Sequence, residues 1–552
     1  MVTSTRIAAA LVACLVLSGC VSSEKEGTDD DFRRVEPRAA FDTNDPVERA
    51  CALDAAILRR ITRGHHPDLS EDVVFVPREP NFVGTFDFTS HSGPWDYLQN
   101  IPLVLYGPGH VVASGAPVTA PARTVDVYPT VAELVGADVE PRDGRVLDEA
   151  VVEGAGPPRL VVVVVWDGAG RNTLERWPER WPNLARLERE GTSYLDAVVG
   201  SSPSVTSAVH SSLGTGVFPR THLVTGNQVR GASGSLVDVY AGNDADDLKP
   251  STFADQIDAA FDNESRVGLL GWKNWHIGMM GHGAALPGGD LDELALLRYG
   301  EGVEVDGNPD AFRTPFFPAE VLDVEDEIAS VDRADGAIDE KWLGHDIGVE
   351  PGNSSWDLYS NPAWAEFQTE VALWMLREGG YGEDEVPDFF FTNFKMTDLA
   401  GHQWSIDGRE TAAVLEAQDR ALGEIVDFLD EEVGDYVVVL TSDHGHSPSP
   451  ASTGAWPIVQ EELIADLDAA FDVPDDESLV EDSAAWGLFL DLELMDELDI
   501  AATDVATFIN AYTIEDNWPS DELPSAFSGR AEEQVFSAAF AGDQLGEIMR
   551  CA

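Results

Sequence analysis

The run from Leu160 to Val165, in which five consecutive valines follow one leucine, constrains the fold more than any other stretch of the chain. A continuous run of β-branched residues is typical of a parallel strand that is buried on both faces. The run ends at Trp166-Asp167-Gly168, and similar apolar runs end in polar, chemically capable residues at three later points: 267–270, 388–394 and 436–440. Helical segments alternate with these runs. The pattern predicts an open α/β sheet whose functional groups gather beyond the carboxyl ends of the strands.

Three of these strand ends carry side chains that can bind metals. Asp398 and His402 are four residues apart, so one turn of a helix can direct both toward one ion. Asp443-His444 forms a second pair, and Asp167 adds a third carboxylate. A single aspartate at a strand end is more often a turn residue or a helix cap. Together these nitrogen and oxygen ligands favour zinc or a similar divalent ion, and two such ions about 4 Å apart can stabilise the entering and leaving oxygens of an in-line displacement.

The stretch 200–216 is rich in serine, threonine and other small residues, and it follows the extended run 194–199. This order predicts a strand-to-helix junction at Thr206. The free N–H groups and the positive end of a helix attract an anion, so they would favour a threonine alkoxide at this point. The alternative interpretation is an ordinary capped helix start. The accompanying metal ligands make Thr206 a candidate nucleophile.

The motifs Asp167-Gly168, Ser204-Val205-Thr206, Asp398-x-x-Gly401-His402 and Asp443-His444-Gly445 resemble those of the alkaline phosphatase superfamily, in particular its nucleotide pyrophosphatase/phosphodiesterase branch. The resemblance implies an α/β fold with a mostly parallel sheet between layers of helices. It also implies Thr206 as nucleophile, Asn227 as a phosphate-binding residue, and two divalent ions, zinc by preference, as cofactors. One ion would be held by Asp167, Thr206, Asp443 and His444, and the other by Asp398, His402 and one more histidine.

That last histidine comes late in the chains of this family, but no histidine follows His446 here. Residues 85–95, 101–109 and 126–130 instead resemble the C-terminal segment of the family, and they contain His91. The resemblance therefore implies a circularly permuted chain, in which the last strands and the final metal ligand precede the first strand. Chain termini usually lie close together on the surface, so such a rearrangement costs little. A partly duplicated domain is the alternative, although each segment occurs only once.

The resemblance implies a small phosphate ester or a nucleotide as substrate. In related monoesterases a Lys-x-Arg pair contacts the additional charged oxygen of a monoester; here Lys273 matches the lysine, but Trp275 stands in place of the arginine. Because tryptophan cannot supply the bidentate, permanently charged group of arginine, a diester or pyrophosphate is the expected substrate. A phosphomonoesterase or a phosphonate hydrolase is the alternative within the superfamily. A non-catalytic, metal-binding surface lipoprotein is the alternative from another class.

The chain is strongly acidic, with 34 basic and 100 acidic residues among 552 and a formal net charge of −66. It lacks the lysine and arginine clusters that bind nucleic-acid phosphates or an anionic membrane surface, so neither is an expected partner. A hydrophobic content of 43% excludes a disordered acidic tail protein. Acidity over the whole chain indicates a surface adapted to high salt, where counterions screen the repulsion. The oligomeric state stays open.

The N-terminus combines Arg6 with the apolar run 7–17, which indicates a secretory signal rather than a membrane span, because crossing a bilayer needs about 20 apolar residues. Residues 17–20, Leu-Ser-Gly-Cys, resemble a bacterial lipobox. This implies that Cys20 is lipid-modified and anchors the exported protein to the outer face of the cytoplasmic membrane; a plain signal peptide is the alternative. Cys51 and Cys551 can form a disulfide in an oxidising compartment or remain two buried free thiols.

These features divide the chain into segments. We expect a signal peptide at 1–19, an acidic tether at 20–46, the permuted C-terminal part of the catalytic domain at 47–158, the core with the nucleophile at 159–284, an inserted cap at 285–360, the core with the metal motifs at 361–454, and an acidic insertion with the C-terminal part of the core at 455–552. Residues 47–63 have the periodicity of one helix.

Overall fold

The computed structural model describes residues 38–91, 93–299, 303–334, 336–348, 359–520 and 522–551. Cys20, the predicted signal peptide and most of the predicted tether lie outside these residues. None of the helices in the described ranges combines the length and the apolar character that a membrane span requires.

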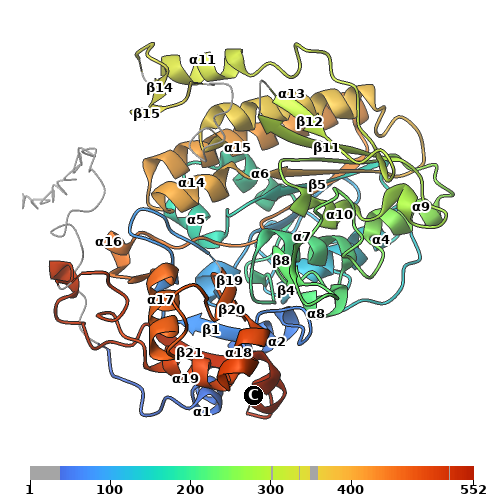
Figure 1. Ribbon diagram of the computed structural model, residues 1–552. Coiled ribbons are helices and arrows are strands. Elements are labelled where there is room, and N and C mark those ends of the chain that lie inside the picture. Colours follow the sequence, from blue (N-terminus) through green and yellow to red (C-terminus); the bar gives the residue numbers. More distant parts are fainter. Residues whose placement is uncertain are drawn as a thin grey trace, which may run out of the picture.

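A nine-stranded sheet forms the centre of the molecule (Figure 1). β5 (Leu160–Trp166) lies between β16 (Asp388–Phe394) and β17 (Tyr436–Thr441) and pairs with both in parallel. The sheet continues beyond β16 with parallel strands β10 (Val267–Gly271), β11 (Asp292–Tyr299) and β13 (Phe312–Arg313). Antiparallel strands complete its edges: β12 (Val303–Asp306) on one side, and β3 (Leu103–Tyr106) and β6 (Thr192–Ser193) on the other. The predicted, mostly parallel α/β sheet is confirmed.

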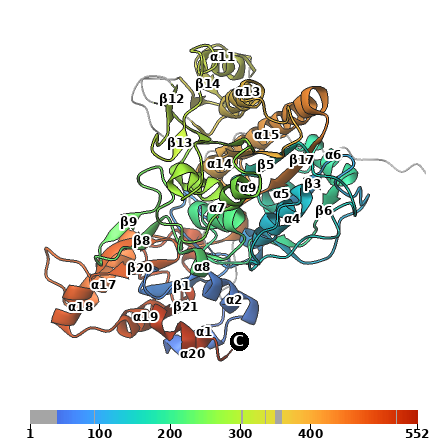
Figure 2. The ribbon, with the colours of Figure 1, turned by 90° about the vertical axis from the view of Figure 1, so that its right-hand side faces the viewer.

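Helices cover both faces of this sheet (Figures 1 and 2). Alternate residues of β5 point to opposite faces, and every residue of the strand is buried. Val162 and Val164 pack in one core with helices α6 (Pro182–Glu190), α13 (Pro362–Glu378) and α15 (Arg409–Phe428). Val161 and Val163 pack in the other core with helices α4 (Val127–Val135), α7 (Thr206–Thr215), α9 (Phe253–Ala260) and α10 (Ile277–Met280). The β-branched run is therefore the centre of two cores, as its sequence predicts.

A second, four-stranded antiparallel sheet joins segments from both ends of the chain. Its order is β19 (Val480–Ala484), β20 (Gly487–Leu490), β1 (Val73–Pro77) and β21 (Phe536–Ala541). One face packs against α1 (Pro46–Cys51), α2 (Ala55–Gly64) and α20 (Leu545–Ile548). The other face packs against α17 (Gln460–Ala470), α18 (Leu492–Leu498) and α19 (Ala502–Ala511). The segment expected as an acidic insertion at 455–552 thus builds a small α/β unit together with β1.

Two other expectations differ from the structure. Residues 47–63 form two helices, α1 and α2, because the Asp54 side chain accepts a hydrogen bond from Ala56 N and starts a new helix. The segment 285–360, expected as a cap, begins with β11 of the central sheet, since its apolar residues 294–297 are buried in the two cores. Only its later part, with α11 (Glu325–Ala334), β14 (Lys341–Trp342) and β15 (His345–Asp346), lies outside the sheet, at the top of Figure 1.

The shorter elements connect these layers. They are β2 (Phe82–Val83), α3 (Asp96–Gln99), β4 (Ala122–Arg123), α5 (Arg171–Arg176), β7 (Ala197–Val198), α8 (Pro219–His222), β8 (Gln228–Arg230), β9 (Leu236–Asp238), α14 (Met396–Trp404), α16 (Pro450–Thr453) and β18 (Pro457–Ile458). Cys51, the last residue of α1, forms a disulfide with Cys551, and the two Cα atoms are 5.4 Å apart.

Candidate metal centre and nucleophile

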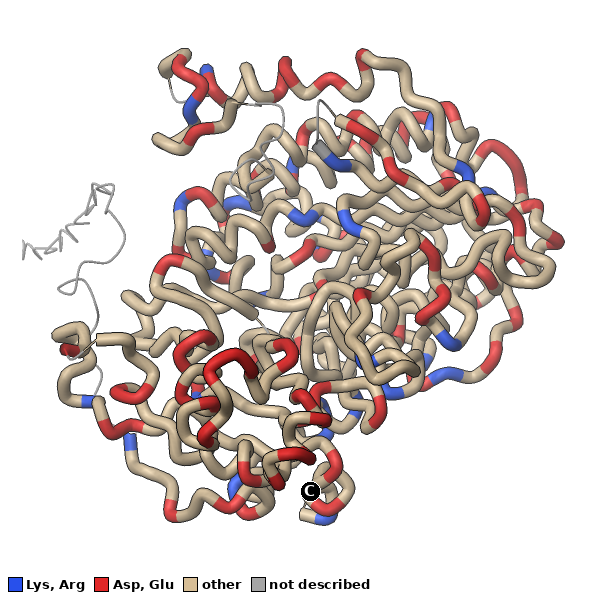
Figure 3. Tube along the Cα trace, viewed as in Figure 1, with Lys and Arg blue, Asp and Glu red and all other residues tan. Residues whose placement is uncertain are grey.

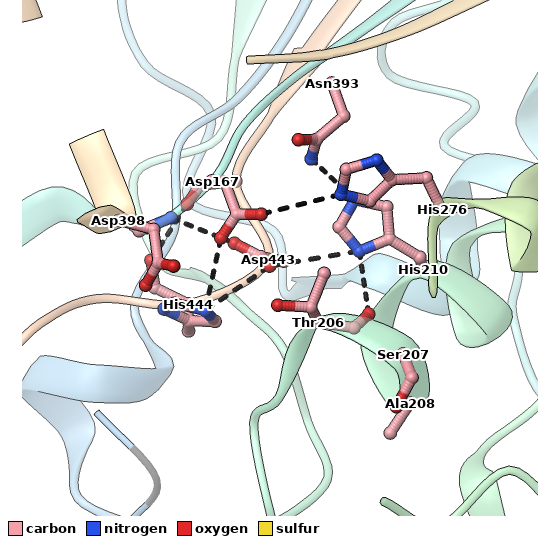
Figure 4. A network of polar contacts seen from close by, with 12 residues as sticks. Asp167, Thr206, Ser207, Ala208, His210, His276, Asn393, Asp398, Asp443 and His444 are labelled. Carbon is pink, nitrogen blue, oxygen red and sulfur yellow. Dashed lines mark hydrogen bonds and ion pairs between the residues drawn. The ribbon is translucent and has the colours of Figure 1, made fainter. Parts of the chain in front are cut away.

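The three aspartates predicted as ligands follow three neighbouring strands of the central sheet. Asp167 comes directly after β5, Asp398 lies in the first turn of α14 after β16, and Asp443 follows β17. These strands are parallel and end at the same level, since Val165 of β5 is in register with both Asn393 and Thr441. Figure 4 shows the three carboxylates facing one another. All three are at least 98% buried.

Asp398 lies among three histidines. Its Oδ1 atom is 3.5 Å from Nε2 of His91, 3.3 Å from Nε2 of His402 and 3.9 Å from Nε2 of His446. The potential ligand atoms of these four buried residues all lie within 4.8 Å of one another. The structure therefore brings His91 to the position that the sequence resemblance implies, from more than 300 residues before Asp398. It also adds His446, to which the sequence assigned no role.

Hydrogen bonds fix the tautomers of three histidines. Nδ1 of His91 contacts Ser204 O at 3.2 Å, Nδ1 of His402 contacts Thr89 O at 2.6 Å, and Nδ1 of His444 contacts Gly445 O at 3.1 Å. A carbonyl oxygen can only accept, so each Nδ1 carries a proton and each Nε2 is the ring nitrogen that is turned toward the carboxylates. This is the arrangement in which an imidazole binds a metal through Nε2.

A second group lies beside the first. Nε2 of His444 is 3.5 Å from Oδ1 of Asp167 and 3.3 Å from Oδ2 of Asp443. The ring of His91 stacks on the ring of His444, with centroids 3.6 Å apart and an interplanar angle of 3°. Ligand atoms of Asp167, Asp398 and His444 lie within 4.8 Å of one another. Asp398 thus belongs to both groups, which places two possible ion positions side by side.

The two groups contain buried polar atoms that need a partner. Both carboxylate oxygens of Asp167, Oδ2 of Asp443 and Nε2 of His444 are buried and have no hydrogen-bond partner within the described part of the chain. Burial, followed by the neighbouring Asp398, raises the pKa of Asp167. Burial and the charges of Asp167 and Asp398 raise the pKa of Asp443 well above its ordinary value. Carboxylate oxygens and imidazole nitrogens that lie this close together, several of them without a hydrogen bond, fit divalent cations, which would supply positive charge.

Thr206 is the first residue of α7, and it is 4% exposed. Figure 4 shows it beside Asp443 and His210. His210 holds the first turn of the helix, because its Nδ1 contacts Thr206 O at 2.7 Å while its Nε2 accepts a hydrogen bond from Asn393 Nδ2 at 2.7 Å. The residue capping α7, Val205, offers no side-chain hydrogen bond, so the first N–H groups of the helix remain available to an anion.

Asn227, which follows α8 in the chain, lies beside the first turn of α7. The Ser207 hydroxyl contacts Oδ1 of Asn227 at 2.9 Å, and the same hydroxyl donates to Gly226 O at 2.8 Å. This contact orients the Asn227 amide beside the residue that follows Thr206. The structure thus brings the predicted nucleophile and the predicted phosphate-binding residue together.

His276 is a buried residue of this site that the sequence did not single out. Its Nδ1 accepts from Trp272 N at 3.2 Å and from Lys273 N at 3.4 Å, so the proton is on Nε2, which lies 3.8 Å from Oδ2 of Asp167. His276 therefore turns an N–H group, and not a lone pair, toward Asp167, which is not the arrangement of a metal ligand. The sequence signal that could have marked His276 is its place shortly after the apolar run 267–270, which forms β10.

The predicted substrate residues lie near a second lysine. Nζ of Lys273 is 4.9 Å from the centroid of the Trp275 ring. Lys395, directly after β16, is 7% exposed, and its Nζ is 4.6 Å from the Tyr359 ring centroid. Burial and the charge of Lys273 lower the pKa of Lys395 to about 7, against the opposing effect of Asp167 and Asp398. Lys395 belongs to the polar residues that follow the apolar run 388–394, but no specific role was predicted for it from the sequence.

Comparisons with known proteins agree with this arrangement. The type I phosphodiesterase/nucleotide pyrophosphatase family matches the chain over residues 161–522. Alkaline phosphatase PhoD of Zymomonas mobilis is 29% identical over 89 residues, which are 16% of this chain and only 16% of that protein. A protein named calcium-transporting ATPase of Myroides odoratus is 22% identical over 407 residues, covering 63% of this chain and 72% of that protein.

The solved structures show the same fold. Wild-type alkaline phosphatase PafA superposes with a TM-score of 0.50 and 17% sequence identity, covering 73% of this chain and 85% of that one. The family match spans the nucleophile helix and the strands that carry Asp167, Asp398 and Asp443, and it covers well over half of the chain. This chain therefore belongs to the type I phosphodiesterase/nucleotide pyrophosphatase family of the alkaline phosphatase superfamily.

Proposed function

We propose that this protein hydrolyses phosphate esters through a covalent phosphothreonine on Thr206. The observation that carries the proposal is the position of Thr206, at the start of α7 and beside the buried group of Asp167, Asp443 and His444. Thr206 Oγ1 would lose its proton and attack phosphorus in line, so that an Oγ1–P bond forms and the bond to the leaving oxygen breaks. Water would then cleave the Oγ1–P bond and restore the hydroxyl.

Different residues of the site would bind the metal ions and the substrate. Asp167, Thr206, Asp443 and His444 would hold one divalent cation, and Asp398, His402 and His91 a second. The bound cations, zinc by preference, would offset the phosphoryl charge and lower the pKa of the threonine hydroxyl. Asn227 and the N–H group of Thr206 would donate hydrogen bonds to the non-bridging oxygens. His210 and His276 would keep Thr206 and Asp167 in place.

The direct test is the capture of the covalent form. The zinc-loaded protein is mixed with a nitrophenyl phosphate ester, quenched in acid and analysed by peptide mass spectrometry. In the wild type we expect one phosphoryl group, on Thr206. In Thr206→Ala we expect no phosphorylated peptide and a loss of at least about 100-fold in kcat. Thr507→Ala removes an exposed threonine on α19 and is the matched control. An active Thr206→Ala protein would exclude this mechanism, and an inactive but zinc-binding wild-type protein would favour the non-catalytic lipoprotein.

Within this reaction class, family membership and Trp275 favour a diester or pyrophosphate substrate. Lys395 favours a second candidate, a phosphomonoesterase, because its buried amine, when protonated, could bind the additional charge of a monoester together with Lys273. The test compares kcat/KM for nitrophenyl phosphate and bis(nitrophenyl) phosphate in Lys273→Ala, Lys395→Ala and the exposed control Lys341→Ala. Selective loss of monoester turnover in the first two variants would support the monoesterase, and equal loss on both esters would support the diesterase.

We also propose that the protein is exported and lipid-anchored through Cys20, as the lipobox resemblance implies. Cys20→Ser should abolish incorporation of labelled fatty acid and release the protein from the membrane fraction. Labelling that persists in this variant would refute the anchor.

A further inference from the structure

A separate cluster of three carboxylates lies far from the proposed active site. It consists of Asp258 on α9, Asp290 in the loop before β11, and Asp292, the first residue of β11. One oxygen from each residue lies within 4.8 Å of the others. The catalytic aspartates follow the carboxyl ends of the parallel strands, whereas Asp292 begins a strand parallel to them. The two groups are therefore separated by about one strand length, on the order of 20 Å.

The oxygens of this group are buried without partners. Asp258 is 1% exposed and Asp292 is 4% exposed. Neither oxygen of Asp258, nor Oδ1 of Asp290, nor Oδ2 of Asp292 has a hydrogen-bond partner within the described residues. Burying carboxylate oxygens without a hydrogen bond or a counterion is unfavourable, so a bound cation would stabilise a carboxylate as buried as Asp258.

The neighbouring basic side chains pair with other carboxylates. Arg313 Nη2 binds Oε1 of Glu293 at 2.8 Å, and the Arg313 side chain is 63% exposed. The nearby Asp255 is acidic, and His282 already pairs with it at 2.9 Å. Burial and the neighbouring carboxylates raise the pKa of Asp258 to about 7 and that of Asp292 well above its ordinary value. The charge of Arg313 lowers the pKa of Asp290 and Asp292 but does not outweigh burial and the neighbouring carboxylates.

We infer that Asp258, Asp290 and Asp292 bind a calcium ion that ties α9 to the start of β11. The donors are all carboxylate oxygens, without histidine or cysteine, and such hard donors select calcium or magnesium rather than zinc. Calcium fits better because it accepts irregular coordination by carboxylates, loop carbonyls and water, and one of the three ligands lies in a loop. The site lies at the opposite end of the strands from Thr206, so its role is to stabilise the edge of the sheet.

The experiment counts calcium in the full chain after the catalytic site has been loaded with stoichiometric zinc. Equilibrium dialysis with labelled calcium should show one calcium ion per chain, and calcium should raise the melting temperature more than magnesium at the same ionic strength. Asp258→Asn/Asp292→Asn should lose both effects. Without calcium this variant should melt no lower than the wild type, because it removes like-charge repulsion while keeping the side-chain shape.

Two further variants make the result decisive. Asp475→Asn/Asp476→Asn removes two exposed carboxylates and should bind calcium as the wild type does. Asp290→Asn, in the half-buried loop position, should raise the calcium Kd by at least about tenfold even if the double variant does not fold. The inference is overturned if the zinc-loaded wild type binds no calcium, if magnesium stabilises it equally, or if Asp290→Asn binds calcium unchanged.

Discussion

His91 reaches the metal centre from a loop that is fastened to the helix carrying its partners. Thr89 N donates to His402 O at 2.9 Å, and the Thr89 hydroxyl donates to Gly401 O at 2.6 Å. The Phe88 ring stacks on the His402 ring, with centroids 4.8 Å apart. These contacts set the position of His91 relative to α14, so two residues distant in sequence belong to the same candidate metal-binding group.

His91→Ala and His402→Ala should therefore be impaired to a similar degree. Each variant removes one imidazole of the group around Asp398, so each should lose bound zinc and at least about 100-fold in kcat/KM. Zinc content by mass spectrometry and ester hydrolysis measure the two effects. His345→Ala, a half-buried histidine beside Glu410, should retain both. A fully active His91→Ala protein would remove His91 from the site.

At the scale of single elements, the close packing of α7 against α10 positions Thr206, the proposed nucleophile. A Cβ on Gly214 would lie 2.1 Å from Gly278 O, and one on Gly278 would lie 2.6 Å from Ser211 Oγ. These glycines allow the two helices to approach closely, and the approach leaves the first turn of α7 at the strand ends. The sequence shows glycines in both helices, but not that they face each other.

β1 brings a titratable group into the small sheet. Glu71, two residues before β1, is 3% exposed, and its Oε1 accepts from Trp486 Nε1 at 2.6 Å. Burial raises its pKa from 4.5 to about 7. Between these two pH values the folded protein binds a proton that the unfolded chain has released. The stability contributed by the protonated form is thus present at low pH and lost as the pH rises through 7.

Glu71→Gln should remove this dependence, because glutamine keeps the acceptor for Trp486 and cannot ionise. Relative to the wild type, the free energy of unfolding of Glu71→Gln should be unchanged near pH 4.5 and higher by on the order of 3 kcal/mol at pH 8. Urea denaturation across this range measures the difference. The exposed Glu532→Gln should track the wild type at every pH. A constant difference across the range would show that Glu71 does not titrate there.

At the scale of the whole molecule, the Cys51–Cys551 disulfide links two ends of the small unit. It closes a loop with a sequence separation of 500 residues. A loop of this length restricts the unfolded chain strongly, so Cys51→Ser/Cys551→Ser should lose up to on the order of 5 kcal/mol in unfolding free energy. Denaturant titration checks the loss, and mass spectrometry of the unreduced digest should show the linked peptides. Two free thiols in the wild-type protein would refute the bridge.

The acidic residues are spread over the whole molecule rather than gathered in one patch (Figure 3). With a formal net charge of −66, mutual repulsion should weaken the folded state where screening is poor. The melting temperature should therefore rise as potassium chloride increases from about 0.01 M to 1 M. Calorimetry of the zinc-loaded protein, with calcium held constant, checks this. A flat curve would show that the acidity is compensated within the fold.

Segments from distant parts of the chain pair with one another in both sheets. β3, from the part of the chain before β5, pairs with β17, and β1 pairs with β21, although β1 and β21 lie near opposite ends of the chain. An unpermuted relative, in which the strands corresponding to β1 and β3 come last in the chain, would have the same strand pairs. The circular permutation stays a prediction, which a rearranged gene starting at β5 would test by its ability to fold and bind zinc.

The sequence by itself determined β5, β16 and β17 and the aspartates at their ends, because a run of β-branched residues and a short metal motif are local signals. The family resemblance supplied His91 and Asn227. Only the tertiary structure showed that His446, His276 and Lys395 lie at the candidate site, since the position of each depends on neighbours from another strand or loop. Only the tertiary structure showed that β11 belongs to the central sheet. It also showed that Asp258, Asp290 and Asp292 come together, although an acidic sequence is typical of a surface loop. Burial is a property of the packed fold, and it turns ordinary carboxylates into candidate cation ligands.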